Sequence, residues 1–89
     1  MPTIFGHHDV KDSKHWLASP EREKLFSAIG ITNIRTFIDP ETPTRVGVLM
    51  DVPDLDAFAA TMASDAAAAA MQNDGVLPET LVLLVEAKA

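Results

Sequence analysis

The side chains of this chain best suited to chemistry are three histidines near its N-terminus. His7, His8 and His15 all lie within the first fifteen of 89 residues. Imidazole has an ordinary pKa near neutrality, so it can act as a general acid or base at physiological pH. The chain contains no cysteine and no tyrosine, which excludes thiolate and phenol chemistry. The histidines are therefore the first candidates for a catalytic role.

Two of these histidines are neighbours on an expected strand. Residues 3–10 are rich in β-branched and aromatic side chains, and adjacent residues of a strand point to opposite faces of the sheet. We expect His8 to face the helices, either as an acid, base or ligand-orienting group or as a core histidine bonded to a backbone carbonyl. We expect His7 to face the other side, as a polar partner of Arg35, Asp51 or Glu86. Because the two rings diverge, they cannot chelate one ion together, and we expect no metal site.

The other candidates for a ligand site are mostly apolar. Trp16 is the only tryptophan, and we expect it to anchor the first helix to the sheet, a role compatible with stacking on an aromatic ligand. His15 follows an expected helix cap at Asp12, so it lies in solvent at the helix start or lines the mouth of a pocket. The remaining candidates are apolar side chains suited to a pocket wall or to a core, namely Met50, Phe58 and Met62.

Four strands and two helical regions are expected to position these groups. The strands span residues 3–10, 31–39, 45–52 and 80–87. One helical region covers 12–28, with a break at Ser19-Pro20 where Ser19 is the expected cap. The other begins at Asp54, restarts at Ser64 and ends by Gly75, and residues 76–78 connect it to the last strand. This order predicts a single α+β domain over residues 1–89 with a ferredoxin-like βαββαβ fold, in which helices cover one face of a four-stranded antiparallel sheet.

The helix-free face of this sheet carries too many large apolar side chains for a monomer. A sheet covered on one side is normally polar on the other. The simplest cover is the same face of a second copy, so we expect an isologous homodimer, with loops or chain ends as the alternative cover. Arg35 shares this face and needs a carboxylate, for which Asp51 and Glu86 have the right parity; anion capture is its second expected role. The apolar residues expected on this face are Phe5, Phe37, Leu49, Val82 and Leu84.

Composition excludes several classes of partner. Seven basic against thirteen acidic residues give a net charge of −6, which repels phosphate backbones, so we expect no nucleic-acid binding. No apolar run approaches the roughly 18 residues of a membrane span, and the N-terminus does not resemble a signal peptide; we expect no membrane association and a cytoplasmic location. Glycine-rich phosphate-binding motifs are absent, and we expect no cofactor.

Three stretches carry a resemblance to a known superfamily. The first is V-x-D-x-x-x-W at residues 10–16, directly after the histidine-bearing strand. The second is G-I-T-N-I-R-T-F at residues 30–37, and the third is V-x-D-x-D-A-F at 52–58 with a later M-x-x-x-G-V at 71–76. In this order they resemble the dimeric α+β barrel superfamily, and more narrowly its small bacterial cyclase-like and antibiotic-biosynthesis-monooxygenase-like members. The resemblance implies a dimer and a ligand pocket between the sheet and the helices of each subunit.

The superfamily includes cofactor-free monooxygenases, polyketide cyclases and haem enzymes, so the resemblance leaves several functions open. The leading hypothesis is a small-molecule-binding protein, acting as a cofactor-free oxygenase or cyclase on a small apolar or aromatic substrate with His8 as acid or base. The alternative is a non-enzymatic ligand-binding or stress-related dimer, which an apolar pocket without a second titratable group would favour. A haem-binding or metal-binding protein is the third hypothesis.

Overall fold

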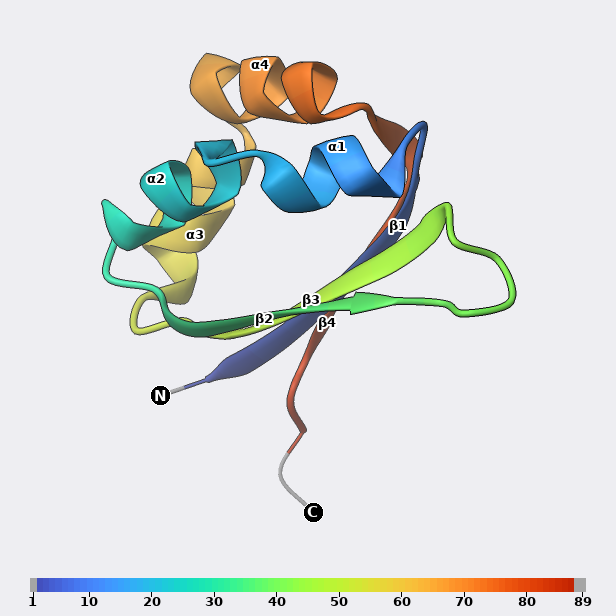
Figure 1. Cartoon of the computed structure of the whole chain (residues 1–89). Helices are drawn as coiled ribbons and strands as arrows, with labels where there is room; N and C mark the ends of the chain where they lie inside the picture. Colours follow the sequence, from blue (N-terminus) through green and yellow to red (C-terminus); the bar gives the residue numbers. More distant parts are fainter. Residues whose placement is uncertain (1, 88–89) are drawn as a thin grey trace.

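Four antiparallel strands and four helices make up residues 2–87, the part of the chain that the computed structural model describes. The strands are β1 (Thr3–Val10), β2 (Thr32–Ile38), β3 (Arg45–Asp51) and β4 (Val76–Val85). The helices are α1 (Ser13–Ala18), α2 (Glu21–Ser27), α3 (Leu55–Met62) and α4 (Asp65–Asp74). The strand order is β2-β3-β1-β4, neighbouring strands are antiparallel, and the helices lie on one side of the sheet (Figure 1). The chain thus has the ferredoxin-like α+β fold that the order of elements predicts.

Short polar side chains begin the helices at nearly every predicted position. Asp12, Asp54 and Ser64 each accept hydrogen bonds from backbone N–H groups of the turn that follows. The predicted break at Ser19-Pro20 separates α1 from α2, but the cap lies one residue later than expected. Pro20 occupies the N-cap position of α2, while the Ser19 hydroxyl accepts from the Glu21 N–H at 3.2 Å. The serine therefore still satisfies a free donor of the first turn.

The last strand begins earlier than the sequence indicated. Residues 76–78 were expected to be a connector, but Val76 pairs with Val10 and Leu77 with Asp9 at the start of β4. The register of this pair shifts between His7 and Asp9. At that shift the Thr80 hydroxyl accepts from the Asp9 N–H at 2.8 Å and donates to the Leu77 carbonyl at 2.6 Å. The Thr80 hydroxyl thus takes the place of a ladder bond at this irregularity. Pro78 lies in the same stretch of an edge strand, where a missing N–H is tolerated.

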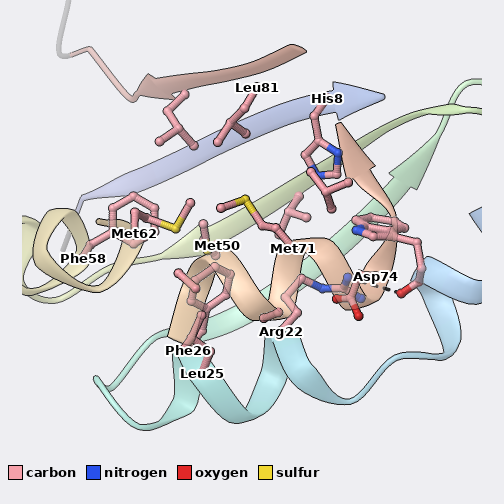
Figure 2. Close-up of a pocket in the computed structure, with 17 residues that line it drawn as sticks. His8, Arg22, Leu25, Phe26, Met50, Phe58, Met62, Met71, Asp74 and Leu81 are labelled. Atoms are coloured by element: carbon pink, nitrogen blue, oxygen red, sulfur yellow. Dashed lines mark hydrogen bonds between the residues drawn. The ribbon is translucent and has the colours of Figure 1, made fainter. Parts of the chain in front are cut away.

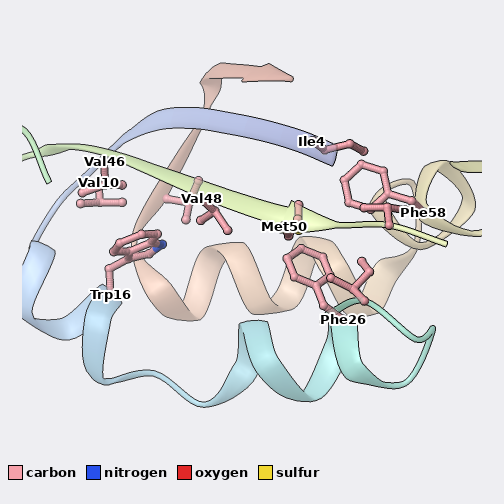
Figure 3. Packing of buried hydrophobic residues seen from close by; sticks show 11 residues of the cluster. Ile4, Val10, Trp16, Phe26, Val46, Val48, Met50 and Phe58 are labelled. Carbon is pink, nitrogen blue, oxygen red and sulfur yellow. The ribbon is translucent and has the colours of Figure 1, made fainter. Parts of the chain in front are cut away.

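The helix-facing side of the sheet forms the core. Every second residue of β1 from Ile4 to Val10 is buried, as are the helix-facing residues of β3 from Val46 to Met50. The helices contribute Trp16, Phe26 and Phe58, which lie against this layer (Figure 3). Burying one large apolar side chain stabilises a fold by about 1.5–3 kcal/mol. These three aromatic residues therefore fix α1, α2 and α3 on the sheet.

The opposite side of the sheet, which we call the open face, carries no helix. Phe37, Val82 and Leu84 are 44%, 42% and 52% exposed there, whereas Phe5 and Leu49 are half-buried. The rings of Phe5 and Phe37 meet edge to face with centroids 6.1 Å apart. Strand pairing places the following residues side by side on this face: Phe5, His7, Arg35, Phe37, Leu49, Val82 and Leu84. The predicted assignment of apolar residues to the two faces is correct.

The helices cover less of their own side than expected. Ile38, Leu83 and Val85 face the helix layer by strand parity, yet they are 38%, 40% and 52% exposed. The helices are short, and the end of β4 runs away from them toward the C-terminus (Figure 1). No helix formed by residues 2–87 is long and apolar enough to cross a membrane.

Candidate functional site

A cavity of about 70 Å³ lies between the sheet and the helices. Its walls come from β1, β3 and β4 on one side and from all four helices on the other. Most of the lining is apolar, with the aromatic rings of Trp16, Phe26 and Phe58. Three methionines, Met50, Met62 and Met71, add flexible side chains to the same walls. Such a surface suits a small apolar or aromatic molecule.

Three polar side chains interrupt this apolar lining. They are His8 of β1, Arg22 of α2 and Asp74 of α4. His8 is 8% exposed and Asp74 is 4% exposed, while Arg22 is half-buried. Figure 2 shows the three at one end of the pocket, with Phe58 and Met62 at the other. The pocket is therefore polar at one end and apolar at the other.

His8 is held in a form that can act as a base. Its Nδ1 lies 3.4 Å from the backbone oxygen of Asp9. Because a carbonyl oxygen only accepts, Nδ1 carries the proton of this long hydrogen bond, which leaves the lone pair on Nε2 in the neutral ring. Burial is the largest influence on this group and lowers the pKa of His8, and the positive charge of Arg22 lowers it further, against the backbone contact and charge of Asp9. His8 is therefore neutral at physiological pH.

Trp16 connects His8 to Arg22. The His8 ring meets the indole edge to face, with centroids 5.7 Å apart and planes at 79°. The guanidinium carbon of Arg22 lies 4.3 Å from the centroid of the same indole, and Nη1 donates to the Trp16 backbone carbonyl at 3.5 Å. This is a cation–π contact on a buried ring. Trp16 both anchors α1, as predicted, and forms one wall of the pocket.

Asp74 is the buried carboxylate of the site. The side-chain amide of Asn73 donates to its Oδ1 at 3.2 Å. Within residues 2–87 the ion pair closer than 4 Å joins Arg45 to Asp39, so Asp74 and Arg22 do not form a direct pair. Burial is nevertheless the main effect lowering the pKa of Arg22, and the negative charge of Asp74 opposes it. The two charges thus influence each other across the polar end of the pocket.

The predicted ligand-site residues are only partly brought together. Trp16, Met50, Phe58 and Met62 line the cavity along with His8. His15 does not; it is exposed, and its Nε2 lies 2.7 Å from the backbone oxygen of Asn73, which ties α1 to the end of α4. His15 is therefore an exposed residue near the start of the helix, the first of its two expected roles, and it does not line the pocket.

The residues expected to be polar partners on the open face do not pair as predicted. Asp51 accepts from the Thr3 hydroxyl at 2.9 Å and from the Asn33 amide at 2.7 Å, and these bonds lower the pKa of Asp51, that from Asn33 most strongly. Within the described residues no side chain closer than 4 Å forms an ion pair with Arg35. His7 lies against the Phe5 ring with centroids 6.0 Å apart. Glu86 is exposed, and its backbone N–H donates to the Thr3 carbonyl at 2.8 Å.

Sequence reasoning missed Arg22 and Asp74 as members of the site. Their positions held a usable signal, because Arg22, Leu25 and Phe26 share one helical face at spacings of three and four residues. Likewise Asp74 follows Ala67, Ala70 and Met71 on the inward face of α4. A charged residue in an otherwise apolar stripe is a candidate site residue. Among residues 2–87, no three histidine, aspartate or glutamate side chains gather as they would around a metal ion.

No family model matches this sequence, and no curated protein matches it closely enough to be called a relative. Solved structures do match its fold. One is a Nitrosomonas europaea protein provisionally described as an antibiotic biosynthesis monooxygenase, with a TM-score of 0.68, 13% identity, and coverage of 99% of this chain and 98% of that one. Another, from Bordetella bronchiseptica and described in the same way, has a TM-score of 0.66, 12% identity, and coverage of 99% and 96%.

A third match is a protein of the dabb family from Mesorhizobium loti, described as having a ferredoxin-like fold. Its TM-score is 0.63 at 17% identity, with coverage of 99% of this chain and 97% of that chain. Identities this low establish the fold and leave activity open. At the level of fold, the resemblance inferred from residues 10–16, 30–37, 52–58 and 71–76 is confirmed.

Proposed function

We propose that this chain binds a small, mostly apolar or aromatic molecule in the pocket between sheet and helices, and that His8 acts on it as a general base. The observation that supports this is a buried histidine, neutral at physiological pH, on the wall of a mostly apolar cavity. A base is effective when its pKa lies near or below the working pH and when water is excluded around it. The burial of His8 and its lowered pKa support this role.

Proton removal by Nε2 fits the chemistry of cofactor-free oxygenases and cyclases. Loss of a proton from an activated C–H group leaves a carbanion or enolate. Its carbon can bond to molecular oxygen, which is thereby reduced to the peroxide level, or to a carbonyl carbon of the same molecule, whose oxygen then takes a proton from the imidazolium. The fold matches to proteins provisionally described as monooxygenases support the first course. No cofactor is required for the proton transfer itself.

Two other functions are distinguished from the proposed one by experiment. A non-enzymatic ligand-binding or stress-related dimer needs the pocket but not the base, and the two further titratable groups, Arg22 and Asp74, favour the enzyme over it. A haem protein would need room for a macrocycle, which is far larger than a cavity of about 70 Å³. The absorbance spectrum of the purified protein tests the haem alternative directly.

The single tryptophan supplies the assay. Trp16 is the only indole in the chain and lines the pocket, so its indole N–H resonance reports on occupancy. We expect titration with p-cresol to shift this resonance saturably. With 2-indanone in deuterated buffer, we expect exchange of the acidic C–H protons to be faster than in buffer alone.

His8→Asn separates binding from catalysis. We expect it to keep p-cresol affinity within severalfold and to slow the exchange by about a hundredfold, the lower end of general-base effects. His7→Asn, on the open face, is the matched control and should change neither. Binding without protein-catalysed exchange would favour the non-enzymatic alternative. The absence of both binding and exchange would contradict the proposed function.

We also propose that two copies pair through their open faces. Phe37, Val82 and Leu84 are 44%, 42% and 52% exposed on this face, and contiguous large apolar side chains of this kind mark an interaction surface. Arg35 lies near one edge of this face and Glu86 near the other. A two-fold axis parallel to the strands would bring Arg35 of each copy close to Glu86 of the other copy.

Sedimentation velocity at micromolar concentration should show a dimer. Leu84→Arg should yield monomers, whereas Leu55→Arg, on the exposed start of α3, should not; a wild-type monomer would refute the pairing.

A further inference from the structure

We propose that Arg22 makes the pocket selective for a molecule that carries an oxygen anion, such as a carboxylate or phenolate, on a small aromatic ring. This inference rests on the proposed binding function and names its class of ligand. It assigns Arg22 as a specificity-determining residue that touches the ligand, in addition to the base at His8.

The guanidinium of Arg22 is held on the pocket wall, but within residues 2–87 no carboxylate lies within 4 Å of it. It is half-buried on the pocket wall, with its carbon 4.3 Å from the centre of the Trp16 ring. Guanidinium carries five N–H donors in a planar fork that matches a carboxylate. Within the described residues, its protein hydrogen bond is the 3.5 Å contact from Nη1 to the Trp16 carbonyl. Most of its donors are therefore free to meet a ligand.

The nearby carboxylate does not complete the pair. Asp74 is buried and receives the Asn73 amide, but it lies beyond 4 Å from Arg22. A desolvated cation without a direct counter-ion is costly, so an anionic oxygen that reaches the guanidinium fork gains more here than it would in water. The charge of Asp74 repels the same oxygen on its own side, so the favoured position is against Arg22.

The shape of the pocket fixes how such a molecule would lie. The polar end holds Arg22 and His8, and the far end holds Phe58 and Met62 (Figure 2). An aromatic ring directed at the apolar end places its oxygen anion at Arg22, with Trp16 alongside. In this pose His8 lies on the pocket wall at the same end as the anionic group. The amphipathic pocket thus matches an amphipathic ligand in one orientation.

Benzoate and benzamide test the inference, because they share size and shape and differ in charge. Affinity is measured for each through the Trp16 indole N–H resonance. We expect the wild-type protein to bind benzoate at least about tenfold more tightly than benzamide, the scale of one hydrogen bond to a charged group. Arg22→Gln should remove that preference and leave benzamide affinity within about twofold. Arg22→Lys, which keeps the charge but loses the fork, should retain part of it.

Lys24→Gln is the matched control, since Lys24 is an exposed cation on the same helix. It should leave the preference unchanged. Equal binding of both probes by the wild-type protein, or a preference that survives Arg22→Gln, would overturn the role of Arg22 while leaving the binding function intact. If neither probe nor p-cresol binds, the proposed function fails and this inference fails with it.

Discussion

The imidazole of His8 and the indole of Trp16 meet edge to face, with ring centroids 5.7 Å apart. One residue comes from the first strand and the other from the first helix, so the contact depends on the docking of α1 onto the sheet. It places a neutral base beside the largest aromatic surface of the pocket.

Acidification should destabilise the protein through His8. The pKa of His8 is lowered in the folded state, chiefly by burial. Between that lowered value and the ordinary value near 6.5 the unfolded chain binds the proton and the folded chain does not, so stability is fully present above about pH 6.5 and falls as the pH drops toward the folded pKa. Urea unfolding at pH 7.5 and pH 5.0 measures this loss. His8→Asn should show a smaller loss between the same pH values, and an equal loss would contradict the assignment.

Removing the charge of Arg22 should raise the pKa of His8. Arg22 is one of the groups that hold this pKa down, but burial contributes more. We therefore expect Arg22→Gln to move the His8 titration upward while leaving it below the ordinary histidine value. The ring proton resonances of His8, followed by NMR against pH, provide the measurement. Lys24→Gln should leave the titration in place; a shift of equal size there would mean that only net charge matters.

Two buried glycines should respond differently to alanine. A methyl group at Gly6, on the pocket floor, would lie 2.9 Å from the end of the exposed Leu83 side chain, which can move aside. At Gly47 it would lie 2.8 Å from the Phe5 ring, which packs over that glycine on the open face. We expect Gly47→Ala to cost about 1–3 kcal/mol of unfolding free energy, as overpacking does. Gly6→Ala should cost less but weaken p-cresol binding, and the reverse order of stabilities would contradict this packing.

The cap of α3 should be worth a measurable amount of stability. The Asp54 carboxylate accepts from the N–H groups of Asp56 and Ala57 at 3.0 and 3.1 Å. Asp54→Ala should lower the free energy of unfolding by about 1 kcal/mol, the usual effect of losing a cap. Asp54→Ser keeps a capping oxygen and should lose only a fraction of that. Thermal unfolding monitored by circular dichroism compares the three proteins.

Local patterns in the sequence determined the elements and the faces of the sheet. Asp12, Asp54 and Ser64 mark helix starts because a short polar side chain there satisfies free N–H groups, wherever the helix later packs. Strand alternation likewise sent His8 inward and Phe37 outward, since successive side chains of a strand must alternate. The start of β4 escaped this reasoning, because pairing of Val76 with Val10 depends on a distant strand and on the Thr80 hydroxyl.

The site itself was decided by tertiary structure. The sequence marked His8, Trp16 and Met50 separately, but only the docking of four helices on one sheet brought them around one cavity. The same docking brought Arg22 and Asp74 from the inward faces of α2 and α4 to the same cavity, and left His15 bonded to the end of α4. A residue's periodicity says which way its side chain points within its own element. What it meets there depends on how that element packs against segments far along the chain, and that packing sets burial, charge and pKa.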